Sequence, residues 1–272
     1  DLLRRAPKDN PRPPATPTYE IHNWVSLACK FPDSTRVPAS ISELSSQYSR
    51  MRGRLGDYWN LMSYGKINIH GQAHGWFDLP KSRASYLPGG EVDLTTLAHD
   101  CVDAARPHVD FSQVYGINLF FNLRLDGRAW GGRRCGMRGM PKQCMPMTWI
   151  PEGSQNSRRL IAHEMGHAYT LPHSDNSDGD SDPYDNVWDN MSGPGFTRWH
   201  PLLGSEPIYL TGWHRRRLEW MPPERIATVM EGVRFNQLFY LDSTTDYSGN
   251  GKHLIIVRQQ PPRNRDGGVD QP

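Results

Sequence analysis

The stretch SRRLIAHEMGHAYTLPH, residues 157–173, predicts the clearest helix of the chain, over 158–171, and contains the pattern H-E-x-x-H. Residues four apart lie on the same face of a helix, so the imidazoles of His163 and His167 can reach one metal ion. The other side of the predicted helix carries the apolar residues Ile161, Met165 and Ala168, which suit a protein core. Such a helix is typical of the floor of a cleft.

A third histidine follows the predicted helix. His173 lies six residues after His167, and Pro172 helps to end the helix because the residue before a proline avoids helical angles. Catalytic zinc favours three protein ligands and a water molecule. The sequence therefore predicts a zinc site with His163, His167 and His173 as ligands, and with Glu164 as the general base that accepts a proton from the water.

The extended pattern resembles the metzincin zinc peptidases, whose motif H-E-x-x-H-x-x-G-x-x-H is followed by a Met-turn. The resemblance implies that Met191, in the stretch 188–193, is the Met-turn methionine and forms an apolar floor beneath the metal. Thr170 stands at the glycine position of the motif, and a β-branched residue is poorly suited to positive φ. We therefore expect the chain to turn at the next two residues instead, and Asp175 and Asp178 stay as alternative third ligands.

Shorter pieces resemble the gametolysin and immune inhibitor A groups of secreted metallopeptidases: 31–33, 58–66, 75–76, 130–132, 147–150 and 214–220. Together with the histidine motif they extend over roughly residues 20–260, although only the motif is specific. The resemblance implies an α+β fold: a metzincin-like zinc peptidase domain with a central twisted sheet, an active-site helix and a C-terminal β-rich segment. It also implies that an extended peptide lies along an edge strand within 127–149.

The domain organisation follows from composition and pattern. Residues 1–18 are rich in proline and predict a tail or linker, and residues 19–222 are expected to form the catalytic domain. Residues 223–272 predict a β-rich C-terminal segment with a disordered end, which either packs onto the catalytic domain or begins a second one.

Hydrophobic periodicity and turn residues predict the individual elements. Strands are expected near 21–31, 66–70, 75–79, 117–125, 225–230, 237–241 and 253–259. Helices are expected from a capping box at Ser40 and Glu43 to about 54, and over 57–63, 93–105 and 207–220. Residues 127–147 predict a long functional loop, with Gly71 interrupting two short strands.

The chain has four cysteines. Cys135 and Cys144 lie close together in a glycine-rich loop, which suits a local disulfide, and Cys29 and Cys101 are the remaining pair. Four cysteines allow three pairings, and free buried thiols are a further alternative. The absence of a C-x-x-C pair argues against a thiolate zinc knuckle. Cysteines compatible with disulfides, together with the family resemblance, predict a secreted, extracellular protein.

Charge and hydropathy narrow the class of partner. The 272 residues include 31 Lys and Arg and 29 Asp and Glu, which gives a net charge of +2 and does not indicate a nucleic-acid partner. We interpret the basic run 214–217 as a solvated helix face. The apolar run 254–257 is far shorter than the ~20 residues that cross a bilayer, so no membrane span is expected. We expect a monomer that acts on a protein or peptide.

Two loops carry clustered charges that could bind calcium or influence the choice of substrate. The acidic loop 175–185 offers the oxygen ligands that calcium prefers, although its spacing does not match an EF-hand. Arg133, Arg134 and Arg138 in the cysteine loop either favour acidic substrates or form a solvated basic surface.

These observations predict a secreted zinc-dependent metalloendopeptidase that hydrolyses peptide bonds by zinc-activated water, with Glu164 as general base. One alternative is a zinc-binding, catalytically weak protein-interaction module. The other is a carbohydrate- or protein-binding domain in which the histidines are incidental.

Overall fold

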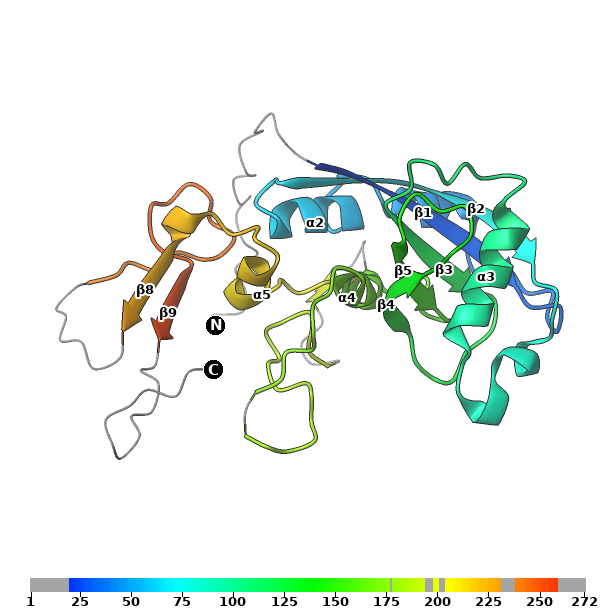
Figure 1. Cartoon of the computed structure of the whole chain (residues 1–272). Coiled ribbons are helices and arrows are strands. Elements are labelled where there is room, and N and C mark those ends of the chain that lie inside the picture. Colours follow the sequence, from blue (N-terminus) through cyan, green and yellow to red (C-terminus); the bar gives the residue numbers. More distant parts are fainter. Residues whose placement is uncertain (1–19, 177, 194–197, 201–203, 231–237, 259–272) are drawn as a thin grey trace.

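The computed structural model describes residues 20–258 except for 177, 194–197, 201–203 and 231–237. The predicted tail at 1–18 and the predicted disordered end after residue 258 therefore lie outside the described residues. The protein has a mixed α+β fold around one central sheet, as the sequence predicts at this coarse level (Figure 1).

The central sheet has five strands in the order β2-β1-β3-β5-β4. They are β1 (Glu20–Lys30), β2 (Ile67–Asp78), β3 (Gly116–Phe121), β4 (Trp130–Cys135) and β5 (Cys144–Ile150). All neighbouring strands are parallel except β4, which pairs antiparallel with β5 and forms one edge of the sheet. Parallel strands of this kind need helices on both faces to bury their apolar side chains.

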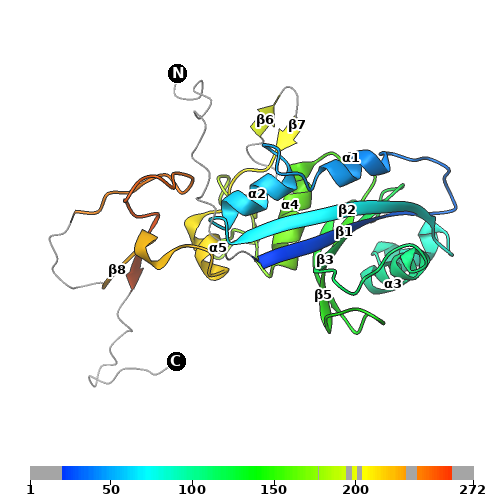
Figure 2. The same ribbon diagram turned by 90° about the horizontal axis from the view of Figure 1, so that it is seen from above.

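Helices cover both faces of the sheet. One face is covered by α1 (Ile41–Ser46), α2 (Leu55–Met62) and α4 (Arg158–Ala168), and the other by α3 (Leu94–Ala105), as Figure 2 shows. The alternation along β1 explains the two layers, because successive side chains of a strand point to opposite faces. Trp24 belongs to the cluster with α2 and α4, whereas Val25 belongs to the cluster with α3.

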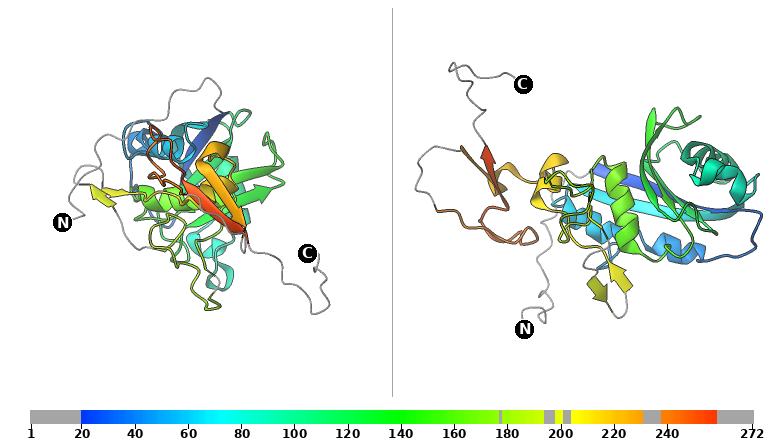
Figure 3. Two further views of the ribbon diagram at one scale, coloured as in Figure 1. Left: turned by 90° about the vertical axis from the view of Figure 1, so that its left-hand side faces the viewer. Right: turned by 90° about the horizontal axis from the view of Figure 1, so that it is seen from below.

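Further strands and one α-helix follow α4 in sequence. They are β6 (Arg198–His200), β7 (Gly204–Glu206), α5 (Gly212–Arg217), β8 (Ile226–Met230) and β9 (Leu254–Arg258). The parallel pair β8–β9 lies at the end of the molecule opposite α3 (Figures 1 and 3). Its segment contacts the rest of the protein where His253 Nδ1 lies 2.9 Å from Tyr64 Oη, and where the Tyr247 hydroxyl donates to Leu61 O. No helix within the described ranges is long and apolar enough to cross a membrane.

Two predictions about strands are wrong for the same physical reason. The predicted strands 66–70 and 75–79 are one continuous strand, β2, and Gly71 does not interrupt it. A Cβ at Gly71 would lie 2.5 Å from the ring of Tyr48, so this glycine allows close packing and forms no turn. The predicted loop 127–147 contains β4 and the beginning of β5, where Gly131 likewise allows a close approach.

Several element ends also differ from prediction. The capping box at Ser40 and Glu43 is present, but α1 stops at Ser46 rather than near 54, and a turn with Gly53 at φ 77° precedes α2. Strand β3 ends at Phe121, and α5 begins only at Gly212. Of the predicted strand 237–241, the described residues 238–241 form only an isolated bridge.

Both disulfides are formed, which selects one of the three pairings and makes the free-thiol alternative wrong. Cys29 on β1 pairs with Cys101 on α3, and their Cα atoms lie 6.0 Å apart. Cys135 and Cys144 pair directly across β4 and β5. The first bond joins a core helix to the sheet, and the second closes the hairpin that forms the sheet edge.

The two disulfides should contribute unequally to stability. Cys29 and Cys101 are 72 residues apart, so their bond removes more entropy from the unfolded chain than the bond that spans 9 residues. We expect Cys29→Ala with Cys101→Ala to lower the free energy of unfolding by about 4 kcal/mol, and Cys135→Ala with Cys144→Ala by about 2–3 kcal/mol. Urea denaturation of the two double variants measures the difference, and equal losses would contradict it.

Candidate metal centre

Helix α4 presents the site and lies directly beneath the edge strand. Ser157 begins the helix, because its side chain accepts a hydrogen bond from Leu160 N. Strand β4 approaches the backbone of α4 so closely that a Cβ at Gly131 would lie 2.0 Å from Glu164 O. Only glycine leaves room for this contact, which brings the sheet edge against the turn that carries Glu164.

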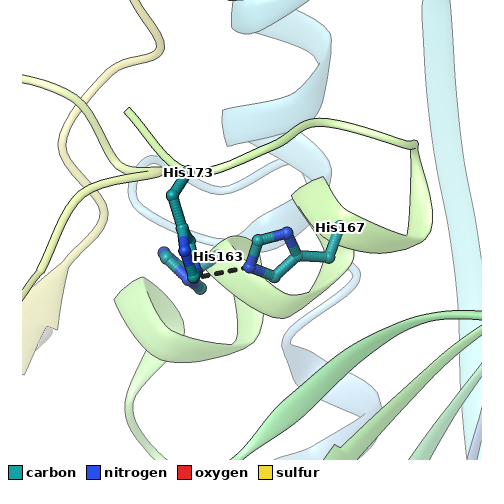
Figure 4. A group of neighbouring side chains, drawn as sticks. All are labelled: His163, His167 and His173. Carbon is teal, nitrogen blue, oxygen red and sulfur yellow. Dashed lines mark hydrogen bonds between the residues drawn. The ribbon is translucent and has the colours of Figure 1, made fainter. Parts of the chain in front are cut away.

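Three histidine side chains converge above α4 (Figure 4). His163 and His167 come from successive turns of the helix, and His173 comes from the segment that follows it. The Nε2 atoms of His163 and His167 lie 3.1 Å apart, and one ligand nitrogen of each of the three histidines lies within 4.8 Å of the others. This half-buried group can bind a metal ion.

Backbone carbonyls fix the tautomers of two histidines. Nδ1 of His163 donates to Asn190 O at 2.7 Å, and Nδ1 of His167 donates to Leu171 O at 2.8 Å. A carbonyl oxygen only accepts, so each Nδ1 carries the hydrogen and each Nε2 keeps its lone pair. The two lone pairs then lie close together and repel, and a cation bound between them would relieve this repulsion.

Burial also holds these histidines in the neutral form that metals bind. It lowers the pKa of His163 to about 3, and it lowers the pKa values of His167 and His173 below the usual value. The proximity of other imidazoles lowers the pKa values of His163 and His167 further, whereas the charge of Asp175 partly offsets the effect of burial on the pKa of His173. A metal ion can bind neutral imidazoles at pH 7 without first displacing protons from the nitrogens that would ligate it.

The chain reverses at Thr170, and here the sequence prediction of another route is wrong. Thr170 has φ 74°, in the left-handed region that favours glycine. Its N–H donates to His167 O at 2.8 Å, and Leu171 N donates to Gly166 O at 2.9 Å. These two bonds form a Schellman motif, which places the carbonyl of Leu171 on His167 and returns His173 to the helix.

The alternative third ligands lie elsewhere. Among the described residues, neither Asp175 nor Asp178 belongs to the histidine group. The exposed Asp178 and Asp180 and the half-buried Asp185 instead form a separate group, with carboxylate oxygens within 4.8 Å of one another. A calcium ion at this second group stays a prediction.

Replacing Thr170 with glycine should stabilise the protein. A β-branched residue in the left-handed region costs about 1–2 kcal/mol, which exceeds the extra unfolded-state entropy of glycine. We expect Thr170→Gly to raise the free energy of unfolding by about 1 kcal/mol in urea denaturation. Thr170→Ala is the control, since it keeps a Cβ at the same φ. A destabilised Thr170→Gly protein would show that no strain is stored at this turn.

The candidate Met-turn packs against the underside of α4. Met191 is fully buried, and a Cβ at Gly166 would lie 2.3 Å from its sulfur. The methionine therefore fits only because α4 carries a glycine between His163 and His167. The preceding residue, Asn190, supplies the carbonyl that orients His163.

A buried aspartate anchors this turn. The carboxylate of Asp189 accepts hydrogen bonds from Met191 N at 2.9 Å, Thr211 Oγ1 at 2.7 Å and His214 Nδ1 at 2.6 Å. Burial by itself raises the pKa of Asp189, but the hydrogen bond and charge of His214 and the donors of Met191 and Thr211 bring it below the usual value. The turn beneath the histidines is thus tied to α5.

Sequence reasoning missed this anchor. The interpretation of 214–217 as a solvated face is wrong for His214 and Arg215, which are 1% and 0% exposed. Arg215 donates from Nε to Leu210 O and from Nη1 to Thr244 O. A basic run carries no local signal of burial, because Asp189 and Thr244, which bind His214 and Arg215, lie 25 and 29 positions away in the sequence.

The anchor gives a stability prediction that depends on pH. Because its pKa is lowered in the folded protein, ionised Asp189 stabilises the fold above its usual pKa of 3.8, and the contribution is lost as the pH falls through the lowered value. We expect Asp189→Asn to lose about 3 kcal/mol at pH 7 and less below about pH 4. Urea denaturation at several pH values tests this, with the exposed Asp78→Asn as control. A deficit independent of pH would contradict a stabilising role of the ionised Asp189 carboxylate.

A cavity of about 590 Å³ opens over the histidines, between β4, α4 and the loop that follows it. Its walls include Trp130, Arg159, His163, Glu164, His167 and Tyr184. Glu164 is 5% exposed, and burial raises the pKa of its carboxyl to about 8. The ring of Tyr184 lies 4.5 Å from that of His173, centroid to centroid, so it covers the third histidine from the loop side.

The structure brings together His163, Glu164, His167 and His173 around one cavity, with Met191 beneath the helix. No protein-family model matches the chain, and no curated protein matches its sequence at a significant level. The metzincin resemblance therefore stays a prediction from the motif residues.

Proposed function

We propose that this protein is a secreted zinc-dependent metalloendopeptidase. The observation that carries the proposal is the convergence of three neutral histidine nitrogens beside Glu164, within a cavity open to solvent. Three protein nitrogens leave room for water or substrate at a fourth position, which is the arrangement of catalytic zinc sites.

The metal would be held by His163, His167 and His173, because one ring nitrogen of each lies within 4.8 Å of the others and the Nε2 atoms of His163 and His167 are 3.1 Å apart. When bound, zinc supplies Lewis acidity that polarises a carbonyl and lowers the pKa of water to about 7. The carbonyls of Asn190 and Leu171 keep two of the rings in the required tautomer throughout.

Glu164 is positioned to move the protons of the reaction. It follows His163 on α4 and lines the same cavity. In the proposed mechanism its carboxylate takes a proton from the attacking water and passes it to the nitrogen of the leaving amine. Its buried position keeps bulk water from competing for that proton.

The sheet edge supports an extended peptide as the substrate. Strand β4 ends the sheet, and an edge strand offers backbone N–H and C=O groups that can pair with another chain. Because Gly131 of β4 touches the backbone of Glu164, a peptide paired with this edge passes close to the catalytic carboxylate. The two disulfides support secretion, since such bonds persist in oxidising compartments.

The test is hydrolysis of fluorescent casein by the purified protein, with and without a chelator and after zinc is restored. We expect cleavage that is lost with the chelator and recovered with zinc. Glu164→Gln should bind zinc at the wild-type stoichiometry and lose about 10²–10⁴-fold in rate, because it removes the general base but no ligand. The exposed Glu91→Gln is the matched control and should cleave at the wild-type rate.

Retained cleavage by Glu164→Gln would overturn the role of this carboxylate. A zinc-loaded wild-type protein that cleaves none of a broad set of peptides would overturn the peptidase and favour the zinc-binding, protein-interaction module. A protein that binds no zinc would overturn both the peptidase and the zinc-binding module.

A further inference from the structure

A buried arginine lines the cavity one helical turn before the first histidine. Arg159 and His163 are four residues apart on α4, so both face the cavity and lie about 6 Å apart along the helix axis. Arg159 is only 8% exposed. A substrate that reaches the metal centre therefore places a neighbouring side chain beside this guanidinium.

The guanidinium has no negative partner among the described residues. Its Nη2 donates to the backbone carbonyls of Ser192 and Gly193, and its Nε has no hydrogen-bond partner within the described part of the chain. None of the ion pairs formed by the described residues includes Arg159. A buried cation without a counter-ion is costly, and an arginine cannot relieve the cost by losing its proton.

The rest of the cavity wall is also poor in negative charge. Arg128 contributes a second guanidinium, which lies 5.8 Å above the Trp130 ring. Glu164 is the one acidic side chain among the described residues that line the cavity. The wall beyond the catalytic carboxylate is therefore cationic and in part aromatic.

We propose that this cavity selects peptides with an acidic side chain next to the cleaved bond, and that Arg159 binds the carboxylate. The inference rests on the proposed peptidase function and names its substrate class. A carboxylate matches the planar fork of a guanidinium, and it supplies the missing counter-ion. Arg128 at the cavity rim strengthens the attraction.

The arginines that select the substrate are thus not those of the cysteine loop. Arg133 donates to Cys144 O, and the guanidinium of Arg134 lies 4.7 Å above the Trp149 ring. Neither of these residues, nor Arg138, lines the cavity. These three arginines therefore belong to the hairpin β4–β5 and lie outside the cavity.

The first experiment profiles cleavage of a proteome-derived peptide library by the zinc-loaded protein, with products read by mass spectrometry. We expect Asp and Glu to be favoured about tenfold or more over Asn and Gln at one position beside the cut. Arg159→Gln should lose this preference, because the amide can still donate to the Ser192 and Gly193 carbonyls but carries no charge. Arg159→Lys should keep a weaker acidic preference.

Arg158→Gln is the matched control. Arg158 is the neighbouring buried arginine, its Nε and Nη2 also have no partner in the described part of the chain, and it does not line the cavity. It should keep the wild-type preference. Equal loss in Arg159→Gln and Arg159→Lys would assign Arg159 a purely structural role and overturn the inference.

A second readout does not depend on catalysis. Two fluorescein-labelled hexapeptides that differ only in a central Glu or Gln are titrated with metal-free Glu164→Gln protein, and binding is followed by fluorescence anisotropy. We expect the Glu peptide to bind about tenfold more tightly, and the difference to vanish when Arg159→Gln is added. Equal binding of the two peptides would overturn the inference.

The two proposals fail in distinguishable ways. Zinc-dependent cleavage without an acidic preference overturns acidic selection and leaves the peptidase intact. Preferential binding of the Glu peptide that depends on Arg159, with no cleavage of any peptide, overturns the peptidase and sustains acidic recognition.

Discussion

The contact between Gly166 of α4 and the sulfur of Met191 determines how the metal centre is assembled. A helix can bring two imidazoles to one face, but it does not by itself fix their rotation. The turn that holds Met191 supplies that constraint, because its neighbour Asn190 accepts the Nδ1 hydrogen of His163. Asp189 then fixes the turn from behind by accepting hydrogen bonds from Met191, Thr211 and His214, so the ring of His163 is oriented by residues 26 and 27 positions away from it.

The parts of the site that the sequence predicts are those that local spacing decides. A separation of four residues within a helix places His163 and His167 on one face in any helix, whatever packs around it. Thr170 shows where local preference stops being decisive. Its unfavourable φ costs about 1–2 kcal/mol, but two backbone hydrogen bonds and the bond from His167 to Leu171 O depend on that turn, and together they outweigh the cost.

The features that the sequence did not predict depend on partners far along the chain. Gly71 and Gly131 are read from sequence as loop residues, yet each lies in a strand because a ring or a carbonyl approaches it closely. His214 lies in a basic run, yet it is buried because Asp189 binds its ring. A glycine that permits contact and a glycine that permits a turn are the same letter, so only the folded chain separates the two uses.

Burial favours the neutral form of the ionisable side chains that line the cavity. It disfavours the charged form of each side chain, so it lowers the pKa of His163 to about 3 and raises that of Glu164 to about 8. Before a metal binds, burial therefore favours the neutral forms of the histidines and of Glu164. A cation held by the histidines would favour the ionised carboxylate that the proposed mechanism needs. Arg159 is the exception, because burial lowers its pKa from a value so high that the guanidinium stays charged. The buried wall thus keeps the positive charge of Arg159 beside groups that burial holds in their neutral forms, and this charge does not depend on a bound metal.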